Sequence, residues 1–104
     1  MSILHASDTT FEREVLAEKG TVLVEFSATW CPPCRALEPV IESLARERAA
    51  TLKVVALDID ESPETCRRFG VRAAPTLMVF REGKRVVAHV GAVPKARIVA
   101  LLER

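Results

Sequence analysis

Two cysteines separated by two residues are the part of this chain best suited to chemistry. Cys31 and Cys34 follow an apolar run that ends at Phe26, and a long helical pattern begins immediately after them. The first turn of a helix has unpaired backbone N–H groups and a partial positive charge. A thiolate placed there is stabilised as an anion, so its pKa falls and it becomes a nucleophile near neutral pH. The second cysteine can close a short disulfide with the first, and the spacing therefore favours reversible thiol–disulfide exchange.

Inert core thiols and half of a zinc site are the alternative interpretations of this pair. Zinc would need two further ligands, and the candidates are Cys66, His5 and His89, which form no second closely spaced pair. We therefore expect no metal site, and we expect both histidines to be structural. Cys66 falls on a short predicted helix, where a buried spare thiol is a better interpretation than a regulatory one.

The composition is that of one globular domain. The 104 residues are 49% apolar and 28% charged, and the formal net charge is +1, a balance that allows a hydrophobic core without structural staples. Lys and Arg are scattered among acids, which argues against a nucleic-acid partner. No apolar run approaches the roughly 18 residues of a membrane span, and the start lacks the pattern of a secretory signal. We expect a cytoplasmic protein that acts as a monomer.

Hydrophobic periodicity predicts strands and helices in alternation. Strands are predicted over residues 22–27, 53–59, 76–80 and 85–90, with a short edge strand near Ile3; helices are predicted over residues 32–49, 63–69 and 94–102, the second of them stopped by Gly70. A further helix near the N-terminus should begin at a Thr9–Glu12 capping box and stop at Gly20. Pro39 should kink the longest helix.

The order β-α-β-α-β-α-β-β-α predicts an α/β fold with a mixed sheet of about five strands and helices on both faces. A right-handed parallel crossover should join strands 22–27 and 53–59, and Glu82-Gly83-Lys84 is short enough only for a hairpin. No repeat or linker divides the chain, so residues 1–104 should form a single domain.

At this point the chain resembles the thioredoxin family along essentially its whole length. The resemblance lies in the identity and spacing of residues 24–35, Pro39, residues 57–60, residues 74–76 and residues 90–92. It implies the thioredoxin fold and a protein-disulfide reductase that uses a redox-active Cys31–Cys34 disulfide and no other cofactor. The implied partners are disulfide-containing protein substrates and a flavin-containing thioredoxin reductase that draws on NADPH.

The resemblance also assigns roles to individual residues. Cys31 would be the exposed attacking thiolate and Cys34 the buried resolving thiol. Glu25 stands where the family usually has a buried aspartate, and it would accept the proton of Cys34 through water. The resemblance further implies that substrate is bound by Trp30, Ala74, Gly91 and a cis Pro75 that faces the disulfide.

Three departures from the family pattern stand out. Pro32 and Pro33 replace the common Gly-Pro, which should tune the redox equilibrium and leaves the Cys34 N–H as the local donor to the Cys31 sulfur. Glu25 replaces aspartate, and Ala56 stands where many relatives carry a lysine near that carboxylate. With one cationic partner fewer, the pKa of Glu25 should be raised.

Two other functions remain alternatives. The cysteine motif also resembles that of membrane-tethered periplasmic reductases that serve cytochrome c maturation. Those proteins carry a leader or anchor and an insertion in the fold, for which the 15 residues between Ile59 and Pro75 leave no room. A non-catalytic thioredoxin-like binding module is the second alternative, and it is disfavoured because both cysteines, Glu25 and Pro75 are all present.

Overall fold

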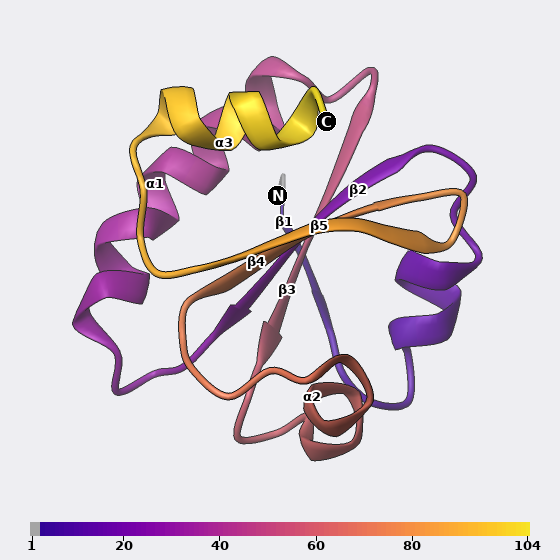
Figure 1. Ribbon diagram of the computed structural model, residues 1–104, viewed down its shortest axis with the longest axis vertical. Coiled ribbons are helices and arrows are strands. Elements are labelled where there is room, and N and C mark those ends of the chain that lie inside the picture. The colour runs from indigo at the N-terminus through magenta and orange to yellow at the C-terminus, as the bar shows by residue number, and fades with distance from the viewer. Residues whose placement is uncertain (1–2) are drawn as a thin grey trace.

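The computed structural model describes residues 3–104 and contains one five-stranded mixed sheet (Figure 1). The strands, in the sheet order β1-β3-β2-β4-β5, are β1 (Ile3–Ala6), β3 (Leu52–Asp58), β2 (Thr21–Ser27), β4 (Thr76–Arg81) and β5 (Lys84–Val90). β3 pairs in parallel with β1 and β2, whereas β4 runs antiparallel to both β2 and β5. The predicted α/β class is confirmed, and the four longer predicted strands are each correct to within one residue.

Helices cover both faces of the sheet, as the sequence predicts. They are η1 (Glu12–Leu16), α1 (Pro32–Glu47), α2 (Pro63–Phe69) and α3 (Lys95–Leu102). α1 and α3 lie on one side, and η1 and α2 lie on the other (Figure 1). Each side therefore has its own hydrophobic core, one centred on Ile41, Leu44 and Ile98 and the other on Phe11, Phe26 and Phe80.

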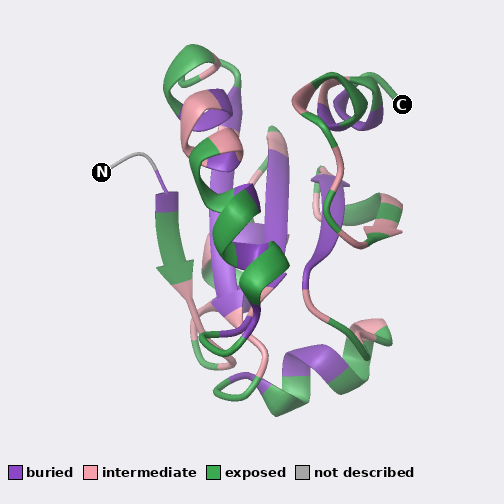
Figure 2. Ribbon diagram, turned by 90° about the vertical axis from the view of Figure 1, so that its left-hand side faces the viewer, coloured by how far each residue is buried: buried purple, intermediate pink, exposed green. Residues whose placement is uncertain are grey.

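The central strands are buried along most of their length (Figure 2). In β2 every residue from Val22 to Phe26 is buried, because a strand covered by helices on both faces must be apolar on both faces. Glu25 is the one charged residue in this run, and it is only 3% exposed. A carboxylate in that position costs free energy unless another part of the structure compensates for it.

The N-terminal helix differs from the prediction. It is a single π-helical turn whose N-cap is Phe11, with no side-chain cap, so the expected Thr9–Glu12 capping box does not form. Thr10 instead accepts a hydrogen bond from a backbone N–H before the helix. The turn ends at Leu16, before Gly20. Burial of Phe11 against the core, rather than local capping, fixes this segment.

The β4–β5 hairpin is tighter than the sequence suggests. Only Glu82 and Gly83 form the turn, with φ values of 51° and 77°, and Lys84 already begins β5. Positive φ at both central residues is the geometry of a two-residue hairpin turn. A Cβ at Gly83 would lie 2.5 Å from the backbone oxygen of Leu16, so glycine also allows the hairpin to approach η1.

The remaining helices follow the sequence closely. α1 continues as one helix through Pro39, and the expected kink stays a prediction. α2 ends at Gly70, which has φ 70°, in agreement with its expected role as a helix stop. No helix within residues 3–104 is both long and apolar enough to cross a membrane.

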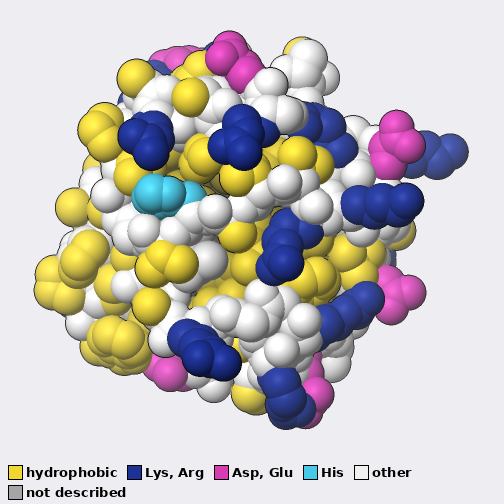
Figure 3. All heavy atoms as spheres, in the orientation of Figure 1, with side chains coloured by type: hydrophobic (Ala, Val, Ile, Leu, Met, Phe, Trp, Pro, Cys, Tyr) yellow, Lys and Arg dark blue, Asp and Glu magenta, His cyan; other side chains and the backbone are white. Residues whose placement is uncertain are grey.

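Charge is less evenly scattered than the sequence analysis expects. Nine of the 15 Lys and Arg residues, but only three of the 14 Asp and Glu residues, belong to residues 62–104. This part of the chain supplies β5 and α3, which lie in front in Figure 1, and Lys and Arg predominate over acids on that face (Figure 3). This face is basic because β5 and α3 both come from the C-terminal part of the chain.

Candidate active site

The two cysteines lie where β2 leads into α1, and they form a disulfide. Their Cα atoms are 5.3 Å apart. Cys31 is the N-cap of α1, and its Sγ accepts a hydrogen bond from the backbone N–H of Cys34 at 3.2 Å. The expected local donor is therefore confirmed. Pro32 and Pro33 occupy the first two helical positions, both exposed, and they supply no N–H.

The burial of the two cysteines corrects one expectation. Cys34 is buried as predicted, but Cys31 is equally buried, and each residue is only 2% exposed. In this oxidised state Cys31 packs in a small cluster with Ala28 and Cys34, against Ile59 and Ala74. The neighbouring loop covers the sulfur that the sequence analysis placed at the surface.

That neighbouring loop contains the predicted cis proline. The Ala74–Pro75 peptide bond is cis, and the Cys31 Sγ lies 3.5 Å from the carbonyl oxygen of Ala74. Gly91, with φ 101°, donates its N–H to the Pro75 carbonyl at 2.8 Å. The fold thus brings Cys31, Ala74, Pro75 and Gly91 together from three separate stretches of the chain.

Trp30 stands at the rim of this site. Its side chain is 61% exposed, whereas a purely structural aromatic residue would be at least half-buried. Its Nε1 donates a hydrogen bond to Asp60 Oδ2 at 2.7 Å. Asp60 in turn donates its backbone N–H to Asp58 Oδ1, in the turn that follows β3.

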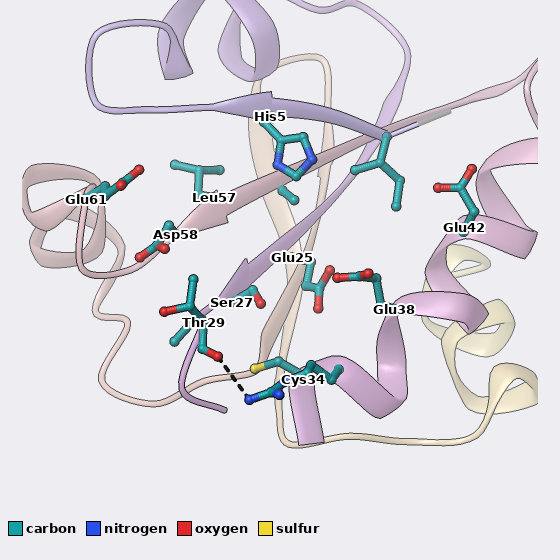
Figure 4. Close-up of a pocket in the computed structure, with 14 residues that line it drawn as sticks. His5, Glu25, Ser27, Thr29, Cys34, Glu38, Glu42, Leu57, Asp58 and Glu61 are labelled. Atoms are coloured by element: carbon teal, nitrogen blue, oxygen red, sulfur yellow. Dashed lines mark hydrogen bonds between the residues drawn. The ribbon is translucent and has the colours of Figure 1, made fainter. Parts of the chain in front are cut away.

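Glu25 and Cys34 line a common pocket of about 680 Å³. Figure 4 shows the carboxylate of Glu25, from β2, and that of Glu38, from α1, pointing toward one another in this pocket. Burial, and secondly the negative charge of Glu38, raise the pKa of Glu25 from 4.5 to about 7. The expected direction is confirmed, and desolvation rather than the missing lysine is its main cause.

The residues considered for zinc do not assemble. Within residues 3–104 no three His, Cys, Asp or Glu side chains are grouped in a way that could hold a metal ion. His5 is exposed and lines the Glu25 pocket from β1, whereas His89 is half-buried on β5. Cys66 is a buried free thiol, and burial followed by the nearby Asp8, Asp60 and Asp58 raises its pKa.

Two residues near the site escaped the sequence analysis. Glu38 lies four residues after Cys34, so the helical repeat places both on one face of α1, and that spacing could have revealed it. Asp60 is 30 residues away from Trp30, and no local pattern connects the two. Arg35, also at the pocket, donates its Nη2 to the Thr29 carbonyl at 3.2 Å (Figure 4).

Comparison with known proteins agrees with this geometry. The family model described as Thioredoxin matches residues 2–104. The chain is 43% identical over 105 residues to Thioredoxin 1 of Synechococcus elongatus, covering all of this chain and 98% of the relative. It is 39% identical over 104 residues to a thioredoxin of Pyropia yezoensis, covering all of this chain and 97% of that protein.

A third relative, a thioredoxin of Pseudomonas aeruginosa, is 42% identical over 101 residues, which are 97% of this chain and 94% of the relative. The match to the family model, residues 2–104, spans every strand of the sheet and includes the cysteine pair. The Cys31–Cys34 disulfide lies at the start of α1 and packs against Ala74, the residue before the cis proline. Its geometry and the comparisons agree: this chain belongs to the thioredoxin family of thiol–disulfide oxidoreductases.

Proposed function

We propose that this protein reduces disulfides in other proteins, with Cys31 as the attacking thiolate and Cys34 as the resolving thiol. The observation that carries the proposal is the Cys31 sulfur at the N-terminus of α1, where it accepts the Cys34 N–H. Such a position stabilises negative charge on sulfur. No acidic residue lies in the first turn of α1 to oppose this effect.

The catalytic cycle moves two electrons from the dithiol to the substrate. The Cys31 thiolate attacks one sulfur of the substrate disulfide, forms a mixed disulfide and displaces the other substrate sulfur as a thiolate, which takes up a proton. Cys34 loses its proton and attacks Cys31 Sγ. This second attack forms the Cys31–Cys34 disulfide seen in the structure and releases the second substrate thiol.

Glu25 is proposed to accept the proton of Cys34, through water. Both residues line one pocket, and a pKa of about 7 lets the carboxyl group take up and release a proton near neutral pH.

Substrate is proposed to bind across Trp30, Ala74, Pro75 and Gly91. Trp30 is exposed beside the disulfide, and the hydrogen bond from Gly91 to Pro75 holds the two loops together. The Ala74 backbone would pair with an extended substrate segment, as a strand adds to a sheet edge. Pro32 and Pro33 would tune the redox equilibrium by stiffening the first turn of α1.

The oxidised protein needs an external source of two electrons, and we assign this role to a thioredoxin reductase. A single close cysteine pair and one buried free thiol suit a reducing compartment, so we place the protein in the cytoplasm, acting as a monomer. Residues 60–74, between β3 and the cis proline, contain only a turn, α2 and a short loop. That length does not accommodate the insertion of the periplasmic reductases.

Single cysteine substitutions test the assigned roles. Cys31→Ser should abolish insulin reduction, whereas Cys34→Ser should still attack and accumulate mixed disulfides, detectable as adducts on non-reducing gels. Cys66→Ser is the matched control, and its activity should equal that of the wild type because this buried free thiol packs in a different cluster from the pair. Equal trapping by the Cys31 and Cys34 variants would contradict the assignment.

A further inference from the structure

The pocket beside Cys34 carries more negative than positive charge. Glu38 and Glu42 reach it from α1, and Asp58 and Glu61 lie at the end of β3 and just beyond it (Figure 4). Arg35 is the one Lys or Arg among the pocket-lining residues within 3–104, and its guanidinium is engaged by the Thr29 carbonyl. The pocket therefore attracts cations.

Glu25 is a second, independent indication of a ligand. Glu25 is only 3% exposed, and within residues 3–104 no hydrogen bond or cation acts on its carboxylate to favour ionisation. Figure 4 shows this carboxylate directed into the pocket toward Glu38. A buried carboxylate without a partner is costly, and a cation entering the pocket would provide the missing partner.

The wall next to Glu25 leaves space for such a group. Ala56 on β3 is the residue paired with Glu25 in the sheet, and it lines the pocket with only a methyl group. His5, paired with Ala56 on β1, borders the same space. A pocket of about 680 Å³ is large enough for a small organic molecule or for the end of a side chain.

The arrangement of the carboxylates favours an organic cation over a metal ion. A metal ion needs several ligands gathered close around one point, and no such group of three exists within residues 3–104. A guanidinium presents five N–H donors on a rigid plane, so it can bond two separate carboxylates at once. A primary ammonium offers three donors from one nitrogen and is the next best match.

We propose that this pocket binds a small organic cation, a guanidinium or a primary ammonium group, held between the carboxylates of Glu25 and Glu38. The cation comes either from a free small molecule or from an Arg or Lys side chain of a bound protein. Binding itself does not depend on the proposed redox cycle. Any influence of the cation on proton transfer from Cys34 would rest on the proposed function.

The proposal has a definite sign with respect to pH. A cation binds the ionised carboxylate of Glu25, so it should lower the pKa of this group and should bind more tightly as the pH rises through the neutral range. Other titratable or charged groups also face the pocket of the oxidised protein, namely His5, Arg35, Glu38, Glu42, Asp58 and Glu61. The test must therefore observe Glu25 itself.

The experiment is a titration of the oxidised wild-type protein, observed by carboxyl ¹³C NMR of labelled glutamate. Millimolar methylguanidinium chloride should lower the titration midpoint of Glu25 by about half a unit or more and should reach saturation. Sodium chloride at equal ionic strength should have a much smaller effect, because it only screens. Magnesium chloride should also shift the titration midpoint of Glu25 by less than methylguanidinium does.

Matched variants locate the site. Glu38→Gln should weaken the apparent affinity for methylguanidinium several-fold, whereas Glu12→Gln, an exposed residue of η1 on the other side of the sheet, should leave it unchanged. The proposal is overturned if the shift does not saturate, if sodium or magnesium chloride matches it, or if both variants bind equally well.

Two capped tripeptides distinguish the sources of the cation. If Gly-Arg-Gly binds at least as tightly as methylguanidinium and Gly-Gln-Gly does not bind, the site accepts a protein side chain. If Gly-Arg-Gly binds more weakly than methylguanidinium, the site is selective for a free small cation. Equal binding of the two tripeptides would contradict recognition of the charge.

Discussion

At the scale of single residues, Glu25 is the least conventional feature of the chain. A carboxyl group in the middle of an apolar strand is desolvated by the surrounding side chains, and its pKa rises to about 7. An apolar residue in the same position would make the protein more stable. The costly carboxyl group therefore indicates a function that needs it. A role in proton transfer gives a reason for it.

Replacing Glu25 by Gln should slow the second thiol step. The amide cannot accept the Cys34 proton, so resolution of the mixed disulfide at pH 7 should slow by about tenfold or more. The first attack, by Cys31, should change little. Stopped-flow Trp30 fluorescence with a model disulfide separates the two steps, and equal slowing of both would contradict a specific role in resolution.

The same substitution should change how stability depends on pH. The native carboxyl holds its proton up to a pKa of about 7, whereas the ordinary pKa of this group is 4.5. The unfolded chain therefore loses this proton first, and wild-type stability should fall as the pH rises from about 4 to about 8. Over this range the Gln variant should gain roughly 3 kcal/mol relative to the wild type.

Urea unfolding of the two oxidised proteins across this pH range measures the difference. Glu12→Gln is the control, because Glu12 is exposed and its stability curve should run parallel to that of the wild type. Parallel curves for the Glu25 variant as well would show that the native state leaves this carboxyl's proton affinity unchanged.

At the scale of elements, α2 shows how one segment completes another. Ser62 stands at its N-cap, yet it makes no capping hydrogen bond, and its buried hydroxyl has no partner within residues 3–104. Asp8, more than 50 residues earlier, accepts the backbone N–H groups of Glu64 and Thr65 and the hydroxyl of Thr65. The cap of α2 is therefore a tertiary contact.

Replacing Asp8 by Ala should destabilise the protein by about 1–2 kcal/mol, since helix N–H groups lose their acceptor. Ser62→Ala should cost much less, because the Ser62 hydroxyl makes no hydrogen bond.

Burial opposes ionisation of Asp8, but the hydrogen bonds from Thr65 and Glu64 outweigh this effect and lower the pKa of Asp8 from 3.8. The stabilisation that Asp8 provides should therefore be present above about pH 3.8 and be lost as the pH falls below that value.

Thermal or urea unfolding near neutral pH compares the two variants. A larger loss for Ser62→Ala than for Asp8→Ala would show that the serine, and not the distant aspartate, caps α2.

At the scale of the whole molecule, the sheet separates two cores, and an aromatic cluster holds the second one together. The Phe80 ring lies 5.8 Å from that of Phe11 and 5.4 Å from that of Phe69, both in edge-to-face geometry. Because these rings come from β4, from the N-cap of η1 and from α2, their contacts join three segments that are distant in sequence.

Phe80→Ala should therefore be among the most damaging single changes, at about 3–5 kcal/mol, since it leaves a cavity where three elements meet. Val86→Ala on the exposed edge strand should change stability by less than about 0.5 kcal/mol. Urea unfolding monitored by circular dichroism compares them. A loss below about 1 kcal/mol for Phe80→Ala would mean that the second core tolerates a void.

Much of this architecture is determined by sequence alone. Continuous apolar runs identify β2 and β3 because a strand covered on both faces has no polar side to show. Pro63 and Gly70 bracket α2 because each has a backbone conformation that suits one end of a helix. The spacing of Cys31 and Cys34 at a strand–helix junction indicates the redox pair for a similarly local reason.

The tertiary structure decided what depends on contacts between distant segments. Three such contacts join residues at least 30 positions apart. The Ala74–Pro75 loop covers Cys31, Trp30 donates a hydrogen bond to Asp60, and Asp8 caps α2. The same holds for η1, where burial of Phe11 prevailed over the local capping signal. Local sequence encodes backbone preference and polarity, whereas these features depend on which surfaces meet once the sheet has formed.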